Sequence, residues 1–244
     1  MRYFLEVAYK GTRYSGFQAQ KNALTIQGEI EKALFVLLKT DISLTGSSRT
    51  DAGVHALQNF FHFDVVENFQ EKWVYNLNAM LPGDIVIKAV MPVGENAHCR
   101  FDASSRTYHY HTYKNKNPFI GDRAYHYPYT LDIDLLNKAA SLIKQYRDFT
   151  SFSKRNTQVK TFNCEIRESR WLQKEEQLVY EVTANRFLRG MVRALTATML
   201  KVGRGIISLE TFCDIIDAKD CTKAYFDTPA HGLTLIKVQY PYFD

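Results

Sequence analysis

Apolar positions recur along the chain with two periods, one typical of strands and the other of helices. Residues 3–9 alternate partly, which predicts a strand with one better-buried face. From Thr25, a good helix N-cap, apolar residues follow helical spacing as far as Leu38, which predicts a helix packed on a sheet. Further strands are expected at 57–63, 85–90, 107–113, 164–172, 178–184 and 235–238, and further helices at 70–79, 135–143, 187–202 and 213–220.

The order of the expected elements is similar in the two halves of the chain. Each half runs strand, helix, strands, helix, strand, although we find no repeat in the sequence itself. A polar passage from Lys114 to Thr130 carries several turn signals and is the best candidate for a linker or excursion. Asp132 or Asp134 is expected to cap the helix that follows it.

Composition permits a sizeable core and slightly favours a nucleic-acid partner. The chain has 244 residues, of which 45% are hydrophobic, so disorder is not indicated and one large domain or two small ones would fit. Its net charge is +5, its pI is about 8.9, and 14% of its residues are aromatic. Cations suit phosphates and rings suit bases, but many soluble enzymes are equally basic.

Cysteine spacing and hydropathy bear on the compartment. The four cysteines form no CxxC pair and no array with zinc-ligand spacing, and His98 beside Cys99 is more easily explained by chance than as a ligand pair. Glu6 interrupts the short apolar run at the N-terminus, which favours a strand over a signal peptide. No uncharged stretch approaches the roughly 20 residues that span a bilayer. We therefore expect a cytoplasmic protein with free thiols.

The most informative stretch is a polar loop at residues 46–56, between two apolar runs. Its centre is Asp51, with Arg49 and Thr50 before it and Gly53 after it. Gly53 can take the positive φ that other residues resist, and such a loop can expose backbone N–H groups toward an anion. The alternative is an ordinary Asx-turn in which Asp51 bonds its own backbone and Arg49 is solvated.

Three other segments combine cations with aromatic or hydroxyl groups. Residues 9–20 and 148–155 could grip an RNA backbone or could be surface turns. In the helix expected at 187–202, Arg186, Arg189 and Arg193 follow i, i+3, i+7 spacing opposite the apolar side, and Gly190 lies within this stripe. A glycine there would cost roughly 1 kcal/mol relative to alanine, which suggests a close backbone or RNA approach. A solvated cationic face is the alternative.

These features suit carboxylate chemistry on a nucleotide better than a Ser-His-Asp site, a P-loop or a metal cluster. If Arg193 or Arg49 pairs with Asp51, the charged form of the acid is favoured, which suits a nucleophile more than a proton donor. Tyr108, in the strand expected at 107–113, could stack on a flipped base. The remaining cations would hold phosphates.

The loop at 46–56 and several other segments resemble those of a known family. The Arg-Thr-Asp-Ala-Gly-Val-His run within 46–56 is similar to the active-site motif of the tRNA pseudouridine synthase A family. Other segments match in the same order along nearly the whole chain: 9–20, 101–113, 148–152, 187–203 and 229–233. Several fragments in the right order make coincidence improbable.

The resemblance implies an α+β pseudouridine synthase fold, with two ferredoxin-like halves forming a continuous, mostly antiparallel sheet flanked by helices. The halves would be 1–105, with the aspartate loop, and 106–244, with the tyrosine strand and the arginine-striped helix. Members are homodimers that act on tRNA without a cofactor or a metal. By resemblance, Asp51 is the catalytic aspartate, Tyr108 stacks on the target uracil, and Arg193 fixes and ionises Asp51. Arg49 would fill the gap left by the extruded nucleotide, and the other expected RNA contacts are Arg13, Gln18, Arg106, Lys154, Arg186 and Arg189.

The implied reaction converts uridine to pseudouridine in the anticodon stem-loop, around positions 38–40. Asp51 would attack C1′ of the ribose or remove the C2′ proton, the N1–C1′ bond would break, and the base would rejoin through C5. Ser48, Lys10 and Phe17 depart from the residues common in the family, which leaves the choice of uridines open. The alternatives are a non-catalytic RNA-binding or RNA-folding protein of the same fold, a paralogue acting on other RNA positions, and a different base-flipping enzyme.

Overall fold

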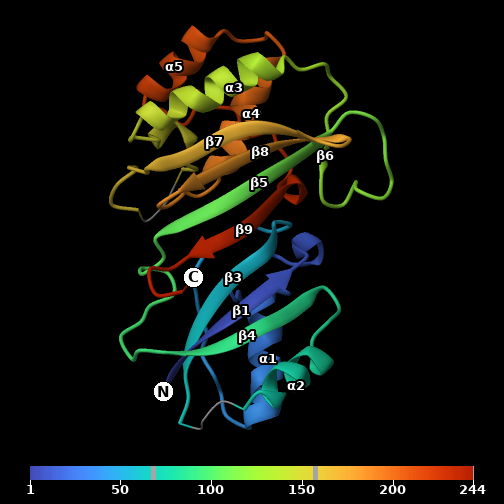
Figure 1. Ribbon diagram of the computed structural model, residues 1–244, viewed down its shortest axis with the longest axis vertical. Helices are drawn as coiled ribbons and strands as arrows, with labels where there is room; N and C mark the ends of the chain where they lie inside the picture. The colour runs from blue at the N-terminus through green and yellow to red at the C-terminus, as the bar shows by residue number, and fades with distance from the viewer. Residues whose placement is uncertain (67–69, 156–158, 244) are drawn as a thin grey trace. The chain divides into compact units, whose positions relative to one another are not determined.

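Helices and mostly antiparallel strands alternate along the chain (Figure 1), which confirms the expected α+β class. The computed structural model describes residues 1–66, 70–155 and 159–243. Within it the chain forms two compact units: unit 1 comprises Met1–Ser104 with the C-terminal segment from Thr234, and unit 2 comprises Ser105–Leu233. No helix in the described part of the chain is long and apolar enough to cross a membrane.

The sheet of unit 1 is built around two long strands, β1 and β3. β1 pairs antiparallel with both β3 and β4, β2 pairs antiparallel with β3, and β9 pairs parallel with β3. The bounds are β1 Arg2–Tyr9, β2 Thr45–Gly46, β3 His55–Asp64, β4 Ile85–Val93 and β9 Leu233–Gln239, with helices α1 Ile26–Leu38 and α2 Lys72–Met80.

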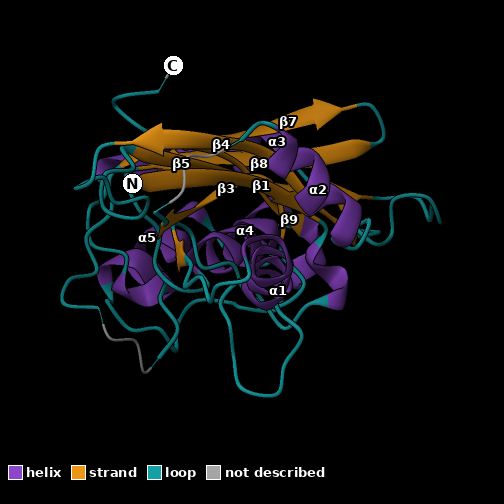
Figure 2. Ribbon diagram, turned by 90° about the horizontal axis from the view of Figure 1, so that it is seen from below, coloured by secondary structure: helices purple, strands orange, loops and turns teal. Residues whose placement is uncertain are grey.

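Helix α1 forms as its sequence predicts. The Thr25 side chain accepts a hydrogen bond from the Gly28 backbone N–H, which caps the helix. The apolar positions at helical spacing, including Ile26, Ile30 and Leu34, are buried. Figure 2 shows α1 lying along one face of the strands of unit 1. The aspartate loop thus leads into β3, a strand of the sheet that α1 covers on one face.

The C-terminal segment covers part of the other face of this sheet. Phe4 points away from the side on which Leu5 is buried, and its ring lies 5.3 Å from that of Tyr240 and 5.8 Å from that of Phe243. The sequence-based division assigned residues 234–244 to the second half. The structure groups them with unit 1, because β9 pairs with β3 and Tyr240 packs on Phe4.

In its described residues, unit 2 has its own antiparallel strands and three α-helices. β8 lies between β5 and β7 and is antiparallel to both, and the short β6 runs parallel to β5. The bounds are β5 Ser105–Tyr113, β6 Tyr125–His126, β7 Ile166–Lys174 and β8 Gln177–Ala184, with α3 Ile133–Leu142, α4 Met191–Gly203 and α5 Leu209–Asp217. Asp132 rather than Asp134 caps α3, through the Leu135 backbone N–H.

Helix α4 differs from the striped helix expected from the sequence. It begins at Met191, because Gly190 has a left-handed backbone (φ +76°) and forms the N-cap. Arg186 and Arg189 therefore lie before the helix, and of the three arginines only Arg193 belongs to it. Nearly all of α4 is buried, so it is a core helix and not an amphipathic helix with a basic face.

The last helix also begins elsewhere than expected. α5 starts at Leu209, four residues before the predicted Cys213, because the Ser208 side chain accepts the Thr211 backbone N–H and caps the helix there. Phe212, Ile215 and Ile216 form its buried face.

Candidate active site

The loop that carries Asp51 connects β2 to β3 in unit 1. Thr50 is buried, Arg49 is exposed and Asp51 is half-buried, so the carboxylate lies at the boundary between core and solvent. The Val54 backbone N–H donates to the Asp51 carbonyl oxygen at 3.2 Å, and Gly53 has a φ of +80°. This turn confirms the positive φ expected of Gly53.

The N-terminal loop packs directly against the aspartate loop. The Phe17 N–H donates to the Thr50 carbonyl oxygen at 3.1 Å, and the Gly11 N–H donates to Nδ1 of His55 at 3.1 Å. Gly16 has a φ of +110°, and a Cβ on it would lie 3.2 Å from the Thr50 oxygen. Two segments that the sequence singled out separately therefore form one surface.

A buried amide on β3 fixes the start of the aspartate loop. Asn59 is fully buried, and its Oδ1 accepts the backbone N–H groups of Ser48 (3.2 Å) and Phe60 (2.9 Å). Its Nδ2 donates to the Ser48 carbonyl oxygen at 2.8 Å and to the Tyr9 hydroxyl at 3.1 Å. The Tyr9 hydroxyl lies 2.7 Å from Oγ1 of Thr50, the residue before Asp51.

Asn59 was not among the residues predicted from the sequence. A signal was present, because Asn59 interrupts an apolar strand, and a buried amide needs hydrogen-bond partners. Its partners could not be read from the sequence.

The cations and the amide expected on unit 1 lie on the exposed side of these loops. Arg13 is in the 3-10 turn Gly11–Arg13, and its guanidinium is 70% exposed while it pairs with Asp84 at 3.3 Å. Gln18 and Arg49 are exposed. Exposed pairs of this kind contribute little to stability, so these side chains can turn toward a ligand.

In unit 2, the segment 185–190 connects most of the predicted site residues. Phe187 contacts Tyr108 of β5 edge to face, with ring centroids 5.2 Å apart. The Arg106 guanidinium donates to the Asn185 carbonyl oxygen at 2.8 Å. The Lys154 backbone N–H donates to the Arg189 carbonyl oxygen at 3.0 Å. The half-buried Tyr108 ring is thus held by the same segment that carries Arg186 and Arg189.

Arg193 lies in the first turn of α4 and holds a loop near the C-terminus of unit 2. Its Nε and Nη2 donate to the Thr228 carbonyl oxygen at 3.0 and 2.6 Å, and the Thr228 hydroxyl donates back to the Arg193 carbonyl oxygen at 2.9 Å. Thr228, which was not among the predicted site residues, therefore orients the predicted arginine.

Tyr110 shares a face of β5 with Tyr108 but has a different environment. It is fully buried, its hydroxyl donates to the Pro229 carbonyl oxygen at 2.7 Å, and Gly232 lies against its ring. Burial raises the pKa of the Tyr110 phenol. Tyr110 therefore supports the loop that Arg193 also holds, whereas Tyr108 is the tyrosine that solvent and ligands can reach.

The predicted residues divide between the units. Asp51, Arg49, Arg13 and Gln18 belong to unit 1, and Tyr108 and Arg193 belong to unit 2 together with Arg106, Lys154, Arg186 and Arg189. In unit 1 the N-terminal loop and the aspartate loop contact each other. In unit 2 Arg106, Tyr108 and Lys154 contact the segment 185–190, whereas Arg193 contacts Thr228. Their roles stay predictions.

Among the described residues, one trio of side chains has the types and spacing of metal ligands. Ligand-type atoms of His62, His98 and Cys99 lie within 4.8 Å of one another. However, Nδ1 of His62 lies 3.4 Å from the Cys99 backbone nitrogen and 3.2 Å from the Cys99 sulfur, and Nδ1 of His98 accepts the Arg100 backbone N–H at 3.2 Å. The Cys99 thiol donates to the Thr45 carbonyl oxygen at 3.1 Å, so these atoms already have hydrogen-bond partners. The trio fits a hydrogen-bonded cluster better than a metal site.

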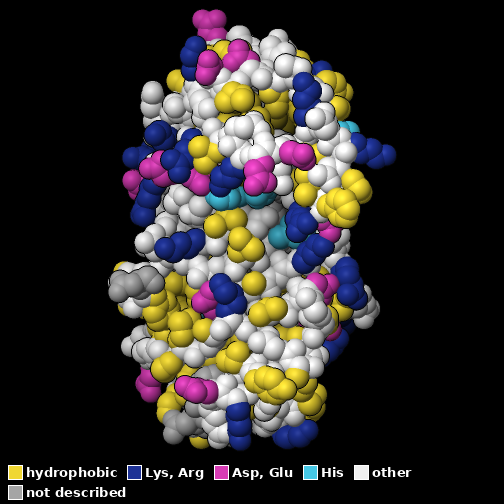
Figure 3. All heavy atoms as spheres, turned by 45° about the vertical axis from the view of Figure 1, so that its right-hand side comes forward, with side chains coloured by type: hydrophobic (Ala, Val, Ile, Leu, Met, Phe, Trp, Pro, Cys, Tyr) yellow, Lys and Arg dark blue, Asp and Glu magenta, His cyan; other side chains and the backbone are white. Residues whose placement is uncertain are grey.

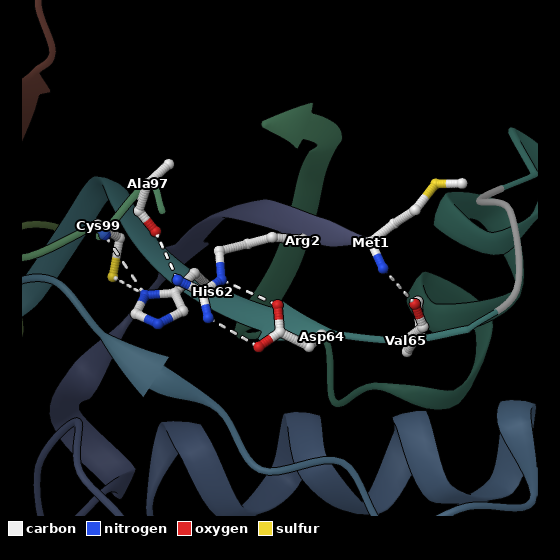
Figure 4. A network of polar contacts seen from close by, with 7 residues as sticks. All are labelled: Met1, Arg2, His62, Asp64, Val65, Ala97 and Cys99. Atoms are coloured by element: carbon white, nitrogen blue, oxygen red, sulfur yellow. Dashed lines mark hydrogen bonds and ion pairs between the residues drawn. The ribbon is translucent and has the colours of Figure 1, made fainter. Parts of the chain in front are cut away.

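The surroundings of His62 also disfavour a cation (Figure 4). The Arg2 guanidinium donates to the Asp64 carboxylate through two nitrogens at 2.8 Å and to the Ala97 carbonyl oxygen at 3.0 Å. Burial first, and then the charges of His98 and Arg2, lower the pKa of His62 to about 4. These contacts join β1, β3 and the segment after β4.

Surface charge is mixed. Figure 3 shows lysine and arginine side chains beside aspartate and glutamate on the face that it draws, with hydrophobic side chains exposed between them. Phe101, Phe119 and Tyr75 are each more than 70% exposed. The excess of positive charge is therefore interrupted on this face, and it supports nucleic-acid binding only together with the loops described above.

Comparison with known proteins identifies relatives along the whole chain. The family profile described as tRNA pseudouridine synthase matches residues 6–102 and 146–241. A protein named tRNA pseudouridine synthase A from Parabacteroides distasonis is 43% identical over 242 residues, which are 98% of this chain and 96% of the relative. Proteins of the same name from Porphyromonas gingivalis (44% identical, 98% and 97% covered) and Staphylococcus aureus strain JH1 (36% identical, 98% and 90% covered) are also similar.

Proposed function

The chain belongs to the tRNA pseudouridine synthase family, and we propose that it converts uridine to pseudouridine in the anticodon stem-loop of tRNA, around positions 38–40. In this proposal Asp51 is the reacting carboxylate, Tyr108 stacks on the target uracil, and Arg193 fixes the carboxylate. The enzyme works as a cytoplasmic homodimer.

The observation that carries the proposal is the setting of Asp51. It is half-buried in the middle of a loop whose preceding residues, Ser48 and Thr50, are buried and hydrogen-bonded to the sheet. Such a loop presents a carboxylate to a ligand with little freedom to move, as a reaction at a defined atom needs. RNA binding alone gives no reason for a fixed carboxylate there, because it repels phosphate.

The proposed reaction balances without an external reactant. Asp51 attacks C1′ or removes the C2′ proton, and the electrons of the N1–C1′ bond leave with the uracil. The base turns and bonds to C1′ through C5. In the first route this displaces the Asp51 carboxylate from C1′, and in the second Asp51 returns the proton to C2′. The C5 proton is then lost to solvent while N1 regains one. Flipping the uridine costs a few kcal/mol, and stacking on Tyr108, at roughly 1–3 kcal/mol per base, would offset part of it.

The remaining predicted residues hold the RNA. Arg13, Gln18 and Arg49 would contact it from unit 1, with Arg49 filling the gap left by the extruded nucleotide. From unit 2 the contacts would come from Arg106, Lys154, Arg186 and Arg189. The last three lie on or beside the segment 185–190 that also positions Tyr108, which links RNA binding to base stacking.

The test maps product on an unmodified tRNA transcript by chemical labelling and primer extension. The control variant is Asp41→Ala, which removes an exposed carboxylate from a different loop. Wild type and this control should give pseudouridine in the anticodon arm, and Asp51→Ala should give none while still binding tRNA. Product outside the arm would favour a paralogue with another target. Tight binding without product on any transcript would favour an RNA-binding or RNA-folding protein.

A further inference from the structure

We propose that Asn59 and Tyr9 are positioning residues, which fix the place of Thr50 and thereby orient Asp51 for reaction. This inference rests on the proposed function and extends it to two buried residues that need not touch the substrate. It follows from the buried hydrogen bonds that connect Asn59 to Thr50 through Tyr9.

The orientation of the Asn59 amide is fixed by its neighbours. Its oxygen faces two backbone N–H groups, those of Ser48 and Phe60, which can only donate. Its nitrogen therefore faces the Ser48 carbonyl oxygen and the Tyr9 hydroxyl. A flipped amide would set donor against donor at Ser48, so a single orientation satisfies the buried group.

That orientation also determines the next contact. The Asn59 amide nitrogen donates to the Tyr9 hydroxyl at 3.1 Å, and the same hydroxyl shares a hydrogen bond with Oγ1 of Thr50 at 2.7 Å. The hydrogen-bonded series Asn59, Tyr9, Thr50 thus ends on the residue next to Asp51.

The hydrogen-bonded series differs from ordinary core packing in where its contacts lead. Asn59 has no exposed surface, Tyr9 is 5% exposed and Thr50 is 8% exposed, whereas Asp51 is only half-buried. The Asn59 amide bonds to Ser48 through both its oxygen and its nitrogen, and Tyr9 bonds to Thr50. The buried polar groups therefore converge on the residues that lead to the carboxylate.

Substitutions that remove one hydroxyl group test the hydrogen-bonded series without opening a cavity. Tyr9→Phe and Thr50→Val should each lower kcat by about 10- to 100-fold and change the KM for tRNA by less than about twofold, because misplacing a reacting group by a fraction of an ångström impairs chemistry more than binding. The double variant should lose no more than the worse single variant, since both changes break the same bond.

The matched control is Tyr3→Phe, which removes a buried hydroxyl from the opposite end of β1, where Tyr3 pairs with Phe63. It should keep the wild-type kcat, and all variants are assayed where near-UV circular dichroism shows them folded. A Tyr9→Phe kcat within twofold of that control, or losses that multiply in the double variant, would overturn the inference while wild type remains active. Failure of the proposed function would show differently, as no pseudouridine from wild type.

Discussion

Protonation of His62 should destabilise unit 1 as the pH falls below neutrality. The pKa of His62 is lowered to about 4 by burial and by the neighbouring charges of His98 and Arg2, whereas an unfolded histidine titrates near 6.5. The unfolded chain therefore binds the proton first, so the stability is complete above about pH 6.5 and falls as the pH drops toward 4. At pH 5 the loss from this one group is about 1.5 to 2 kcal/mol.

The assay is urea unfolding at pH 7 and pH 5 for wild type and His62→Gln, both in a Trp171→Phe background. Trp73 in α2 then reports the unfolding of unit 1. Other groups titrate equally in both proteins, so the difference between their pH effects isolates His62. Wild type should lose about 1.5 to 2 kcal/mol more than His62→Gln. Equal losses would refute the burial argument.

Substitutions at Gly190 and at Arg193 test two contacts of unit 2. Gly190→Ala should destabilise the protein by about 1–2 kcal/mol and weaken tRNA binding, because φ is +76° and the new Cβ would lie 3.0 Å from Cγ of Lys154. Gly83→Ala, with nothing within 4 Å of the new Cβ, is the control in urea unfolding and filter binding, and equal effects would contradict the prediction. Arg193→Lys keeps the charge but cannot reproduce the two-nitrogen contact with the Thr228 carbonyl, so kcat should fall substantially, and further in Arg193→Ala. A lysine variant with wild-type kcat would show that charge alone suffices.

Features set by neighbouring residues could be predicted from the sequence. Helix α1 and its Thr25 cap follow from local spacing and cap chemistry, and the positive φ of Gly53 follows from the turn that it occupies. The prediction of an arginine stripe along one helix was wrong, and the reason is also local. The i, i+3, i+7 spacing of the arginines also fits a loop followed by a helix, and the left-handed backbone of Gly190 places the start of the helix after the first two arginines.

Contacts between distant residues could not be predicted in this way. Asn59 holds Ser48, eleven positions earlier, and Arg193 holds Thr228, thirty-five positions later. His62 joins His98 and Cys99 only when β3 folds beside the segment after β4. In each case the sequence indicates a polar group in an apolar setting, and the fold supplies its partner.

If Asp51 isomerises uridine in tRNA, the hydrogen at uridine C5 is lost when the new bond forms, and its release can be measured. A tRNA transcript with tritium at uridine C5 is incubated with wild type and with Asp51→Ala, and released tritium and RNA mass are both measured. Wild type should release tritium in step with conversion and leave the mass of an unlabelled transcript unchanged, and Asp51→Ala should release none. Tritium release retained in Asp51→Ala would exclude Asp51 as the reacting group, and a change in RNA mass with wild type would exclude an isomerisation.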